Sequence, residues 1–521
     1  MKKQRLIAVV SLLMMAVLCL GLIACNNANE PEGTTAVETT PVTDPATEAP
    51  TVPATEAATE TPTEMPTEAP TEKATEAPTE APTEIPTEAP TEIPTEVPTE
   101  ELTEAPTEVL TEAPTEPETE PETEPSIKDE LGLEVNMSDL NTLMQPIFSG
   151  TSSVNETVMF LDYGDEKTLL YPIESVVSVT SFDGSKTYEE GKDYEIVDGK
   201  LKILEGSAIP CITRAKYYNY PSHPQINITA NYEGKNVNIY WGEGKPMNDY
   251  QVNVNYTHAD AWEGYRQPAE LETLQNFVKK LQAGEDVTIV FYGDSITYGA
   301  SATWLAGYAP YQETYPMMVT MALADLFDYT VHYEKAGLTG TANVPTEDYV
   351  AGDRGTITYV NTAVGGWTSQ DGVNNLEAYI KNKVAAHGCD LFIVGYGMND
   401  GAITPRQTAK NMEKIANAVL ENNAEAGIVF VSTMVPNPNA TNGWYGHQDQ
   451  QEAHLERTAK NFRDDGVACV VSNMTSVSKA VLEHKEFHDY SGNNINHPND
   501  YFVRVYAQTL LQTIIGYENM N

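Results

Sequence analysis

The sequence has few basic residues. Its 521 positions include 30 lysines and arginines against 76 aspartates and glutamates, which gives a formal net charge of −46. A protein that binds nucleic acid needs clustered lysine and arginine to contact the phosphates. The shortage of basic residues therefore argues against nucleic acid as a partner. The charge is also uneven, since 26 of the acidic residues and a single lysine fall within residues 30–125.

Cysteine is scarce as well. Two of the five cysteines, Cys19 and Cys25, lie at the N-terminus, and Cys211, Cys389 and Cys469 are left for the rest of the chain. Three cysteines whose spacing fits no metal-ligand pattern predict neither a disulfide framework nor a zinc site. Cys389 and Cys469 lie in or beside apolar runs, so we expect them to be small buried side chains.

The N-terminus has the pattern of a secretory signal. Lys2, Lys3 and Arg5 precede an apolar run over residues 6–24, which ends in small residues before Cys25. The segment Leu-Ile-Ala-Cys resembles a bacterial lipobox, which implies that Cys25 carries lipid and becomes the first residue of a membrane-anchored, extracytoplasmic lipoprotein. An ordinary signal peptide or a single membrane helix is the alternative.

Residues 26–126 repeat Pro-Thr-Glu-Ala and close variants, without one aromatic residue between 30 and 125. Such a segment buries too little apolar surface to offset the loss of chain entropy on folding. Frequent proline and repelling glutamates favour extended conformations. We therefore expect a disordered linker that holds the following domains away from the membrane.

Residues 127–265 carry short β-rich runs separated by turn residues. This spacing predicts a small β-sandwich domain. The expected strands are Thr157–Tyr163, Val176–Phe182, Tyr194–Val197, Leu201–Leu204, Ile226–Tyr232, Val237–Trp241 and Tyr250–Tyr256.

Residues 266–521 alternate between apolar strands and amphipathic helices, which predicts an α/β domain with a parallel sheet covered by helices on both faces. The expected strands are Val287–Tyr292, Ile357–Val364, Leu391–Tyr396, Ile428–Thr433 and Val467–Val471. The expected helices are 314–327, 369–387, 404–423, 447–462, 474–484 and 500–515. In such sheets the functional site lies beyond the carboxyl ends of the strands.

Four short motifs fall where this rule requires them. Gly293-Asp294-Ser295 follows the first strand directly, and the backbone amides of the next helix lie beside the serine hydroxyl. Gly366 and Asn399 each follow a further strand, and His497 lies in a loop before the last helix. A Gly-Asp-Ser tripeptide alone is also a good turn or helix cap, so the four motifs together carry the argument.

The order Ser, Gly, Asn, His resembles the four blocks of the SGNH, or GDSL-like, hydrolase superfamily. The resemblance covers about residues 285–521 and implies a flavodoxin-like three-layer α/β fold. It implies that Ser295 is the nucleophile and His497 the base. The backbone amides of Ser295 and Gly366, with the Asn399 side chain, would form the oxyanion hole of an acyl-transfer reaction.

The sequence departs from that family at one position. The family usually has aspartate three residues before the histidine, and this chain has Asn494. An asparagine cannot stabilise an imidazolium by charge. A serine–histidine dyad oriented by a backbone carbonyl and a triad are therefore equally open. Asp489 or Asp500 is a possible substitute, although each is more typical of a helix or loop cap.

Three further residues are candidates for contacting the substrate: Asp294, Trp367 and Trp444. The tryptophans lie next to the expected site, where rings stack on sugar faces, although packing is their ordinary role. No cofactor is implied, and the spacing of His488, Asp489, His497 and Asp500 fits no standard metal site.

The arrangement of a β-sandwich before the hydrolase unit resembles carbohydrate esterase family two. This implies an acetylesterase that acts on acetylated polysaccharide or oligosaccharide, with plant cell-wall glycans as the expected source. A peptidoglycan O-acetylesterase and a lipid esterase are the alternative enzymes. A glycan-binding surface protein with a decayed hydrolase unit is the non-enzymatic alternative, but all four motifs are filled.

Overall fold

The computed structural model describes residues 139–222, 227–441, 444 and 446–519. The expected signal peptide, the expected lipidation site Cys25 and the expected linker over 26–126 lie outside these residues. No described helix has the length and apolar character that crossing a membrane requires.

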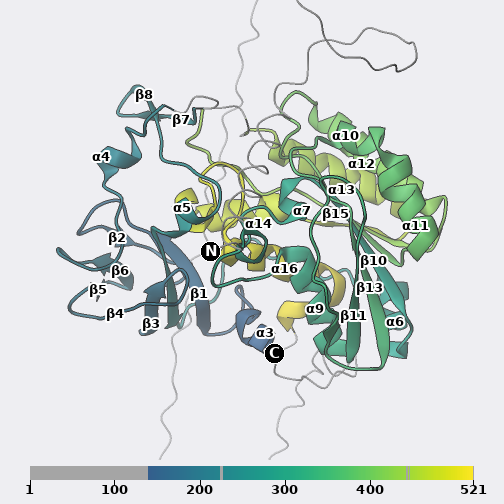
Figure 1. Ribbon diagram of the computed structural model, residues 1–521, viewed down its shortest axis with the longest axis horizontal. Helices are drawn as coiled ribbons and strands as arrows, with labels where there is room; N and C mark the ends of the chain where they lie inside the picture. Colours follow the sequence, from purple (N-terminus) through teal and green to yellow (C-terminus); the bar gives the residue numbers. More distant parts are fainter. Residues whose placement is uncertain (1–138, 223–226, 442–443, 445, 520–521) are drawn as a thin grey trace, which may run out of the picture. The chain divides into compact units, whose positions relative to one another are not determined.

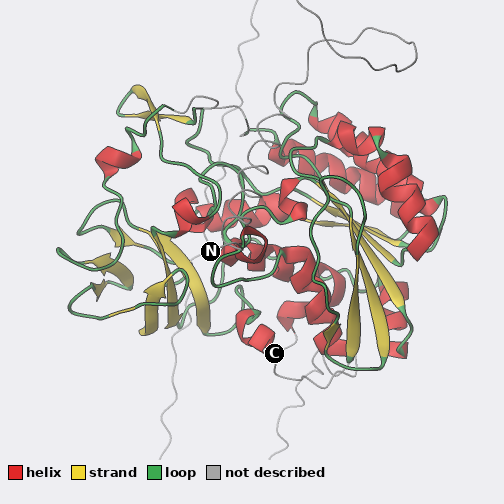
Figure 2. Ribbon diagram, in the orientation of Figure 1, coloured by secondary structure: helices red, strands yellow, loops and turns green. Residues whose placement is uncertain are grey.

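The N-terminal region of the described chain contains small sheets whose paired strands are antiparallel (Figure 2). A four-stranded sheet has the order β1-β9-β3-β4, a three-stranded sheet has the order β2-β6-β5, and β7 pairs with β8. The strands are β1 (Ser152–Met159), β2 (Glu166–Lys167), β3 (Ser175–Ser181), β4 (Thr187–Tyr188), β5 (Tyr194–Val197), β6 (Lys200–Ile203), β7 (Thr229–Tyr232), β8 (Lys235–Asn238) and β9 (Gln251–Thr257). Three short helices belong to this region: α3 (Asp139–Leu143), α4 (Arg214–Tyr217) and α5 (Lys245–Asn248).

The C-terminal region contains a seven-stranded sheet of order β12-β11-β13-β10-β14-β15-β16 (Figure 1). All neighbouring strands in it are parallel except β11 and β12. The strands are β10 (Val287–Gly293), β11 (Tyr329–Glu334), β12 (Tyr349–Val350), β13 (Gly355–Asn361), β14 (Leu391–Gly395), β15 (Gly427–Val431) and β16 (Cys469–Ser472). The three-layer α/β fold expected from the sequence is confirmed.

The helices cover both faces of this sheet. In β10, Ile289 and Phe291 face one buried cluster, whereas Val290 and Tyr292 face another, as the two-residue period of a strand requires. The longer helices are α6 (Gln275–Ala283), α9 (Tyr315–Phe327), α12 (Pro405–Leu420), α13 (Gln448–Asp464), α14 (Met474–Leu482) and α16 (Asp500–Ile515). The shorter helices are α7 (Ser295–Tyr298), α8 (Thr303–Ala306), α10 (Ser369–Asn374), α11 (Asn382–His387), α15 (Phe487–Tyr490), the π-helix η1 (Glu377–Lys381) and the 3₁₀-helix η2 (Tyr517–Asn519).

The structure differs from the sequence expectation in several elements, and two of these differences have a clear physical reason. The helix expected over 369–387 is three segments, α10, η1 and α11, because a π-helical turn interrupts the α-helical pattern. Strands β11 and β12 were not expected. The burial of β11 alternates with exposure, so it lacks the continuous apolar run by which the buried strands were found.

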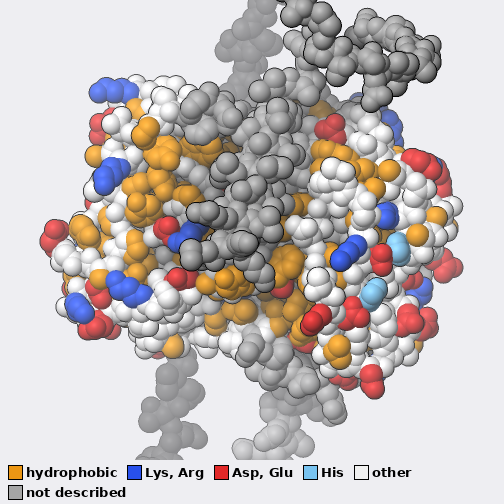
Figure 3. Space-filling model, in the orientation of Figure 1, with side chains coloured by type: hydrophobic (Ala, Val, Ile, Leu, Met, Phe, Trp, Pro, Cys, Tyr) orange, Lys and Arg blue, Asp and Glu red, His pale blue; other side chains and the backbone are white. Residues whose placement is uncertain are grey.

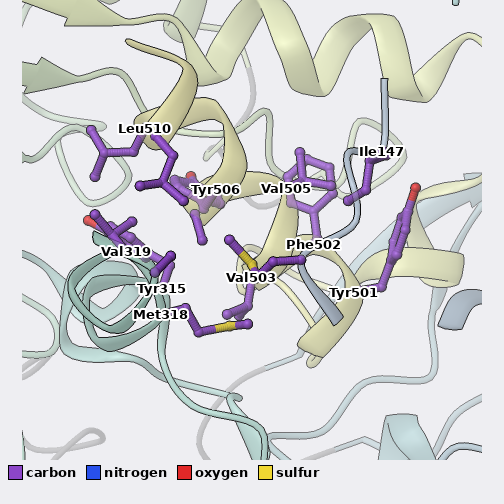
Figure 4. Close-up of a cluster of buried hydrophobic side chains, with 14 of the residues drawn as sticks. Ile147, Tyr315, Met318, Val319, Tyr501, Phe502, Val503, Val505, Tyr506 and Leu510 are labelled. Atoms are coloured by element: carbon purple, nitrogen blue, oxygen red, sulfur yellow. The ribbon is translucent and has the colours of Figure 1, made fainter. Parts of the chain in front are cut away.

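Helix α16 packs against both the N-terminal and the C-terminal region. All of its sixteen residues are buried. Figure 4 shows its side chains between Ile147, from the N-terminal region, and the α9 residues Met318 and Val319. The same buried cluster includes Val254 of β9, so one core continues across the boundary expected at residue 265. Cys389 and Cys469 lie in the core as unbridged thiols, which confirms the expectation that they are small buried side chains.

Candidate active site

Ser295 lies at the carboxyl end of β10, at the start of α7. The turn is tight, since a Cβ on Gly293 would lie 2.4 Å from both the carbonyl oxygen of Gly395 and Oγ1 of Thr297. Only glycine fits there. Asp294 caps α7, and its Oδ1 accepts a hydrogen bond from the Ile296 amide at 3.0 Å. This turn fixes the backbone on both sides of Ser295.

The loop before α16 brings a histidine to this serine. Nε2 of His497 lies 2.9 Å from Oγ of Ser295, and both residues are 3% exposed. The two residues come from opposite ends of the hydrolase region, as the sequence predicted they would. The serine hydroxyl donates to Nε2, because the other ring nitrogen carries its hydrogen toward a carboxylate.

That carboxylate belongs to Glu243, between β8 and α5 in the N-terminal region. Its Oε2 lies 3.0 Å from Nδ1 of His497. Ser301 Oγ donates to the same oxygen at 3.3 Å, and Asn493 Nδ2 donates to Oε1 at 2.9 Å. Both carboxylate oxygens are therefore held, and a Ser–His–Glu chain of hydrogen bonds is complete.

The negative charge of Glu243 and the positive charge of a protonated His497 stabilise each other. Burial opposes ionisation of Glu243, but the positive charge of His497 and hydrogen bonds from His497, Asn493 and Ser301 lower the pKa of the carboxyl below its ordinary value. Burial likewise opposes an imidazolium at His497, but Glu243 and then Asp294 raise the pKa of the imidazole above its ordinary value. The site therefore stabilises a proton on His497.

Asn493 organises the loop over residues 491–499, which carries His497 and is called the histidine loop. Its Oδ1 accepts hydrogen bonds from the backbone amides of Ile495 at 2.9 Å, Asn496 at 2.9 Å and His497 at 3.0 Å. Its Nδ2 donates to Glu243. One buried side chain therefore fixes both the loop that carries the base and the carboxylate that orients it.

A carbonyl-oriented dyad, one of the two possibilities left open by the sequence, is thus wrong, because a carboxylate faces Nδ1. Asp489 and Asp500 do not supply that carboxylate. Asp489 accepts from the amides of Met159 and Glu486, and Asp500 accepts from the amide and hydroxyl of Thr303.

Asn494 faces away from the histidine. Its Nδ2 donates to the Tyr217 hydroxyl and to the Tyr240 carbonyl, each at 2.7 Å, and its Oδ1 accepts from Asn437 at 3.1 Å. Its backbone is left-handed, with φ of 62°. Asn494 therefore joins the histidine loop to the N-terminal region.

The expected oxyanion residues lie beyond β13 and β14. Gly366 is exposed, with φ of 81°, and Gly365 approaches Ser295 closely enough that its Cβ would lie 3.9 Å from that of the serine. Asn399 Nδ2 donates to the Trp367 carbonyl at 3.0 Å, which leaves its second amide hydrogen for another acceptor. Their part in an oxyanion hole stays a prediction.

The three candidates for substrate contact have different surroundings. Asp294 is 2% exposed, and burial raises its pKa to about 7 while the amides of Ile296 and Met398 oppose that rise. Its contacts are those of a helix cap. Trp367 is partly exposed, with its ring centroid 4.7 Å from that of Tyr379, and Trp444 packs partly buried against two clusters. Substrate contact by these residues stays a prediction.

One group of side chains in the described residues has the geometry of metal ligands. It consists of Glu486, His488 and Asp489. The ammonium of Lys167 lies among them, bonded to Glu486, 3.0 Å from Nε2 of His488 and 3.2 Å from Oδ1 of Asp489. The lysine supplies the positive charge that these acidic groups require.

Sequence reasoning missed Glu243 and Asn493. Glu243 lies 254 positions before His497, in a region with no catalytic motif. Asn493 stands next to the position where the family pattern was sought, and the run of asparagines there was the one available signal.

Residues 289–498 match the sequence profile of the family described as GDSL-like Lipase/Acylhydrolase. No curated protein matches the chain.

Several solved structures are similar to it. One is a two-domain esterase active on acetylated mannans, with 18% identity and a TM-score of 0.34 over 48% of this chain; the chain spans about half, 54%, of that protein. Another is an acetylxylan esterase from Geobacillus stearothermophilus, with 17% identity and a TM-score of 0.31 over 45% of this chain and 96% of that one. A third is a G-D-S-L family member from Veillonella parvula, with 13% identity and a TM-score of 0.29 over 43% of this chain and 97% of that one.

Proposed function

We propose that the protein removes O-acetyl groups from polysaccharides, with residues 289–498, which match the GDSL-like Lipase/Acylhydrolase profile, as its carboxylic ester hydrolase domain. The observation that carries the proposal is the hydrogen-bonded chain from Ser295 through His497 to Glu243. It is the arrangement that acyl transfer through a serine requires.

In the proposed reaction, Oγ of Ser295 attacks the acetyl carbon while Nε2 of His497 takes the hydroxyl proton. Glu243 accepts from Nδ1 and stabilises the imidazolium that forms. The backbone amides of Ser295 and Gly366 and the side-chain amide of Asn399 donate hydrogen bonds to the oxyanion of the tetrahedral intermediate. His497 then protonates the departing sugar oxygen. A water molecule attacks the acyl-enzyme while His497 takes its proton, and the return of that proton to Oγ of Ser295 releases acetate and restores the serine.

The surroundings of Ser295 favour a short acyl group. The side chain is almost wholly buried, and the residues that hold its partner are polar, among them Asn493, Ser301 and Glu243. A long acyl chain would need an extended apolar groove at this point. We therefore place acetyl esters ahead of lipid esters.

The proposed location is the outer face of the cell membrane, with Cys25 as the lipid-bearing residue and the Pro-Thr-Glu segment as the spacer. The sequence pattern before Cys25 supports this part of the proposal.

The test compares acetate release by the chain from acetylated glucomannan, acetylated xylan, O-acetylated peptidoglycan and p-nitrophenyl acetate. The proposal expects turnover of at least one of the two plant-type glycans. Preferential release of acetate from peptidoglycan would mean that peptidoglycan, and not a plant-type glycan, is the substrate. No release of acetate from any of the four substrates would contradict the proposed function.

A further inference from the structure

An aromatic surface lies beside the candidate active site, on the N-terminal region. We name it the tyrosine surface; it consists of Tyr218, Tyr220, Tyr232, Tyr240, Trp241 and Tyr250. The rings of Tyr218 and Tyr232 are stacked, with centroids 3.8 Å apart and planes at 6°. Tyr240 makes edge contacts with Tyr220 at 4.9 Å and with Tyr250 at 5.6 Å.

The members of this surface are all partly exposed. The tyrosine beneath them, Tyr217, is buried, and its hydroxyl accepts from Asn494. In Figure 3 hydrophobic side chains, which include tyrosine and tryptophan in its colour key, gather over α4, the β7–β8 hairpin and α5. Apolar patches of this kind on a protein surface commonly mark binding sites.

The tyrosine surface adjoins the hydrogen-bonded residues Ser295, His497 and Glu243. The Tyr240 carbonyl accepts from Asn494, and the Gly242 amide donates to the Asn493 carbonyl at 3.3 Å. Glu243 follows directly. A ligand on these rings therefore lies against the same segment that supplies the carboxylate to His497.

The loop that carries Trp444 also meets this surface. The Thr441 amide donates to the Thr229 carbonyl at 2.7 Å, and Ala230 of β7 forms a β-bridge with Ala440. Trp444, Tyr240 and Trp241 pack against the same buried cluster. Aromatic side chains from both regions thus border one surface.

The chemistry of the tyrosine surface fits a neutral, hydroxyl-rich chain. The negative faces of aromatic rings attract the C–H face of a sugar ring, and tyrosine hydroxyls at their edges exchange hydrogen bonds with sugar hydroxyls. Of the positive charges nearby, Arg214 pairs with Asp162 and Asp165 and Lys245 pairs with Asp249, whereas Lys216 and Lys235 are exposed.

We propose that the tyrosine surface holds the main chain of the glycan while an acetyl group on a neighbouring sugar reaches Ser295. The inference rests on the proposed function for its choice of ligand. It adds a binding site, made by the N-terminal region, that selects polymeric over small esters.

The experiment measures binding without turnover. In the full chain with Ser295→Ala, affinity for acetylated glucomannan and acetylated xylan is measured by retardation in gels that contain each polymer. Combining Tyr218→Ala with Tyr232→Ala is expected to lower the affinity for the bound glycan by about tenfold or more, since two ring contacts are lost. Tyr218→Phe keeps the ring and is expected to retain affinity within about twofold.

Tyr349→Ala is the matched control, because Tyr349 is a partly buried tyrosine on β12 at the far edge of the seven-stranded sheet. It is expected to leave glycan affinity unchanged. Thermal unfolding of each variant shows whether the fold is kept, and Tyr220→Ala provides a second site if the double variant fails to fold.

Unchanged glycan affinity in the folded alanine variants overturns the inference, as does stronger binding to phosphatidylglycerol vesicles or self-association through this surface. The result is separable from the proposed function. If the active chain releases acetate but the tyrosine variants bind normally, only this inference fails; if the inert chain binds through the tyrosines but the active chain releases no acetate, only the function fails.

Discussion

Glu243 Oε2 lies 3.0 Å from Nδ1 of His497, although 254 positions separate the two residues in the chain. The N-terminal region therefore supplies one member of the catalytic chain to the hydrolase region. Its role is that of a positioning residue, because it acts on the substrate through the histidine.

The first prediction concerns the pH dependence that Glu243 imposes. The base must be neutral to accept the serine proton, so kcat/KM rises with pH through the pKa of His497. Glu243 raises that pKa. Glu243→Gln removes the charge and is expected to move the acidic limb of the profile to lower pH, while the plateau falls by about a hundredfold or more.

The pH profile of p-nitrophenyl acetate hydrolysis measures both effects. Glu413→Gln, at an exposed position on α12, is the control and should match the unmodified chain. A lower plateau with an unmoved acidic limb would mean that Glu243 has only a structural role.

The second prediction concerns Asn494. Its side chain binds Tyr217, Tyr240 and Asn437, not His497. Asn494→Ala is therefore expected to cost about threefold to tenfold in kcat/KM through loop geometry, whereas His497→Ala costs about a thousandfold or more because the base is lost.

Asn494→Asp restores the residue usual in the family but is expected to lower activity and thermal stability. A carboxylate there would face the Tyr240 carbonyl without the amide hydrogens that now bind it. Increased activity in Asn494→Asp would show that the new carboxylate reaches the imidazole, against the geometry described.

The third prediction concerns Asn399. If the second amide hydrogen of Asn399 donates a hydrogen bond to the oxyanion, Asn399→Ala should lower kcat by about a hundredfold to a thousandfold with little change in KM. Asn374→Ala, at an exposed position of α10, serves as the control in the same steady-state assay. A rise in KM at constant kcat would assign Asn399 to substrate binding instead.

The fourth prediction concerns metals. The acidic groups of the one ligand-like cluster among the described residues are already bonded to Lys167, and these carboxylates raise the pKa of the lysine although burial opposes it. Exhaustive chelation is therefore expected to leave the rate of p-nitrophenyl acetate hydrolysis unchanged. Loss of turnover that zinc or manganese restores would contradict this.

The sequence was sufficient for the parts that local patterns encode. Continuous apolar runs predicted β10, β14 and β15 because those strands are buried on both faces. The rule that sites follow parallel strands placed Ser295 at the sheet edge. The role of Glu243 could not be predicted from the sequence, because this residue lies among short strands with no motif. Only the packing of the N-terminal region on the histidine loop brings Glu243 to His497.

Replacement of the serine tests the central claim most directly. Rates of acetate release from p-nitrophenyl acetate and acetylated glucomannan are compared for the full chain and for Ser295→Ala, with thermal unfolding as the check that the fold is kept. Loss of the covalent nucleophile is expected to lower both rates by at least about a thousandfold. A folded Ser295→Ala variant that keeps a tenth of the activity would contradict the account.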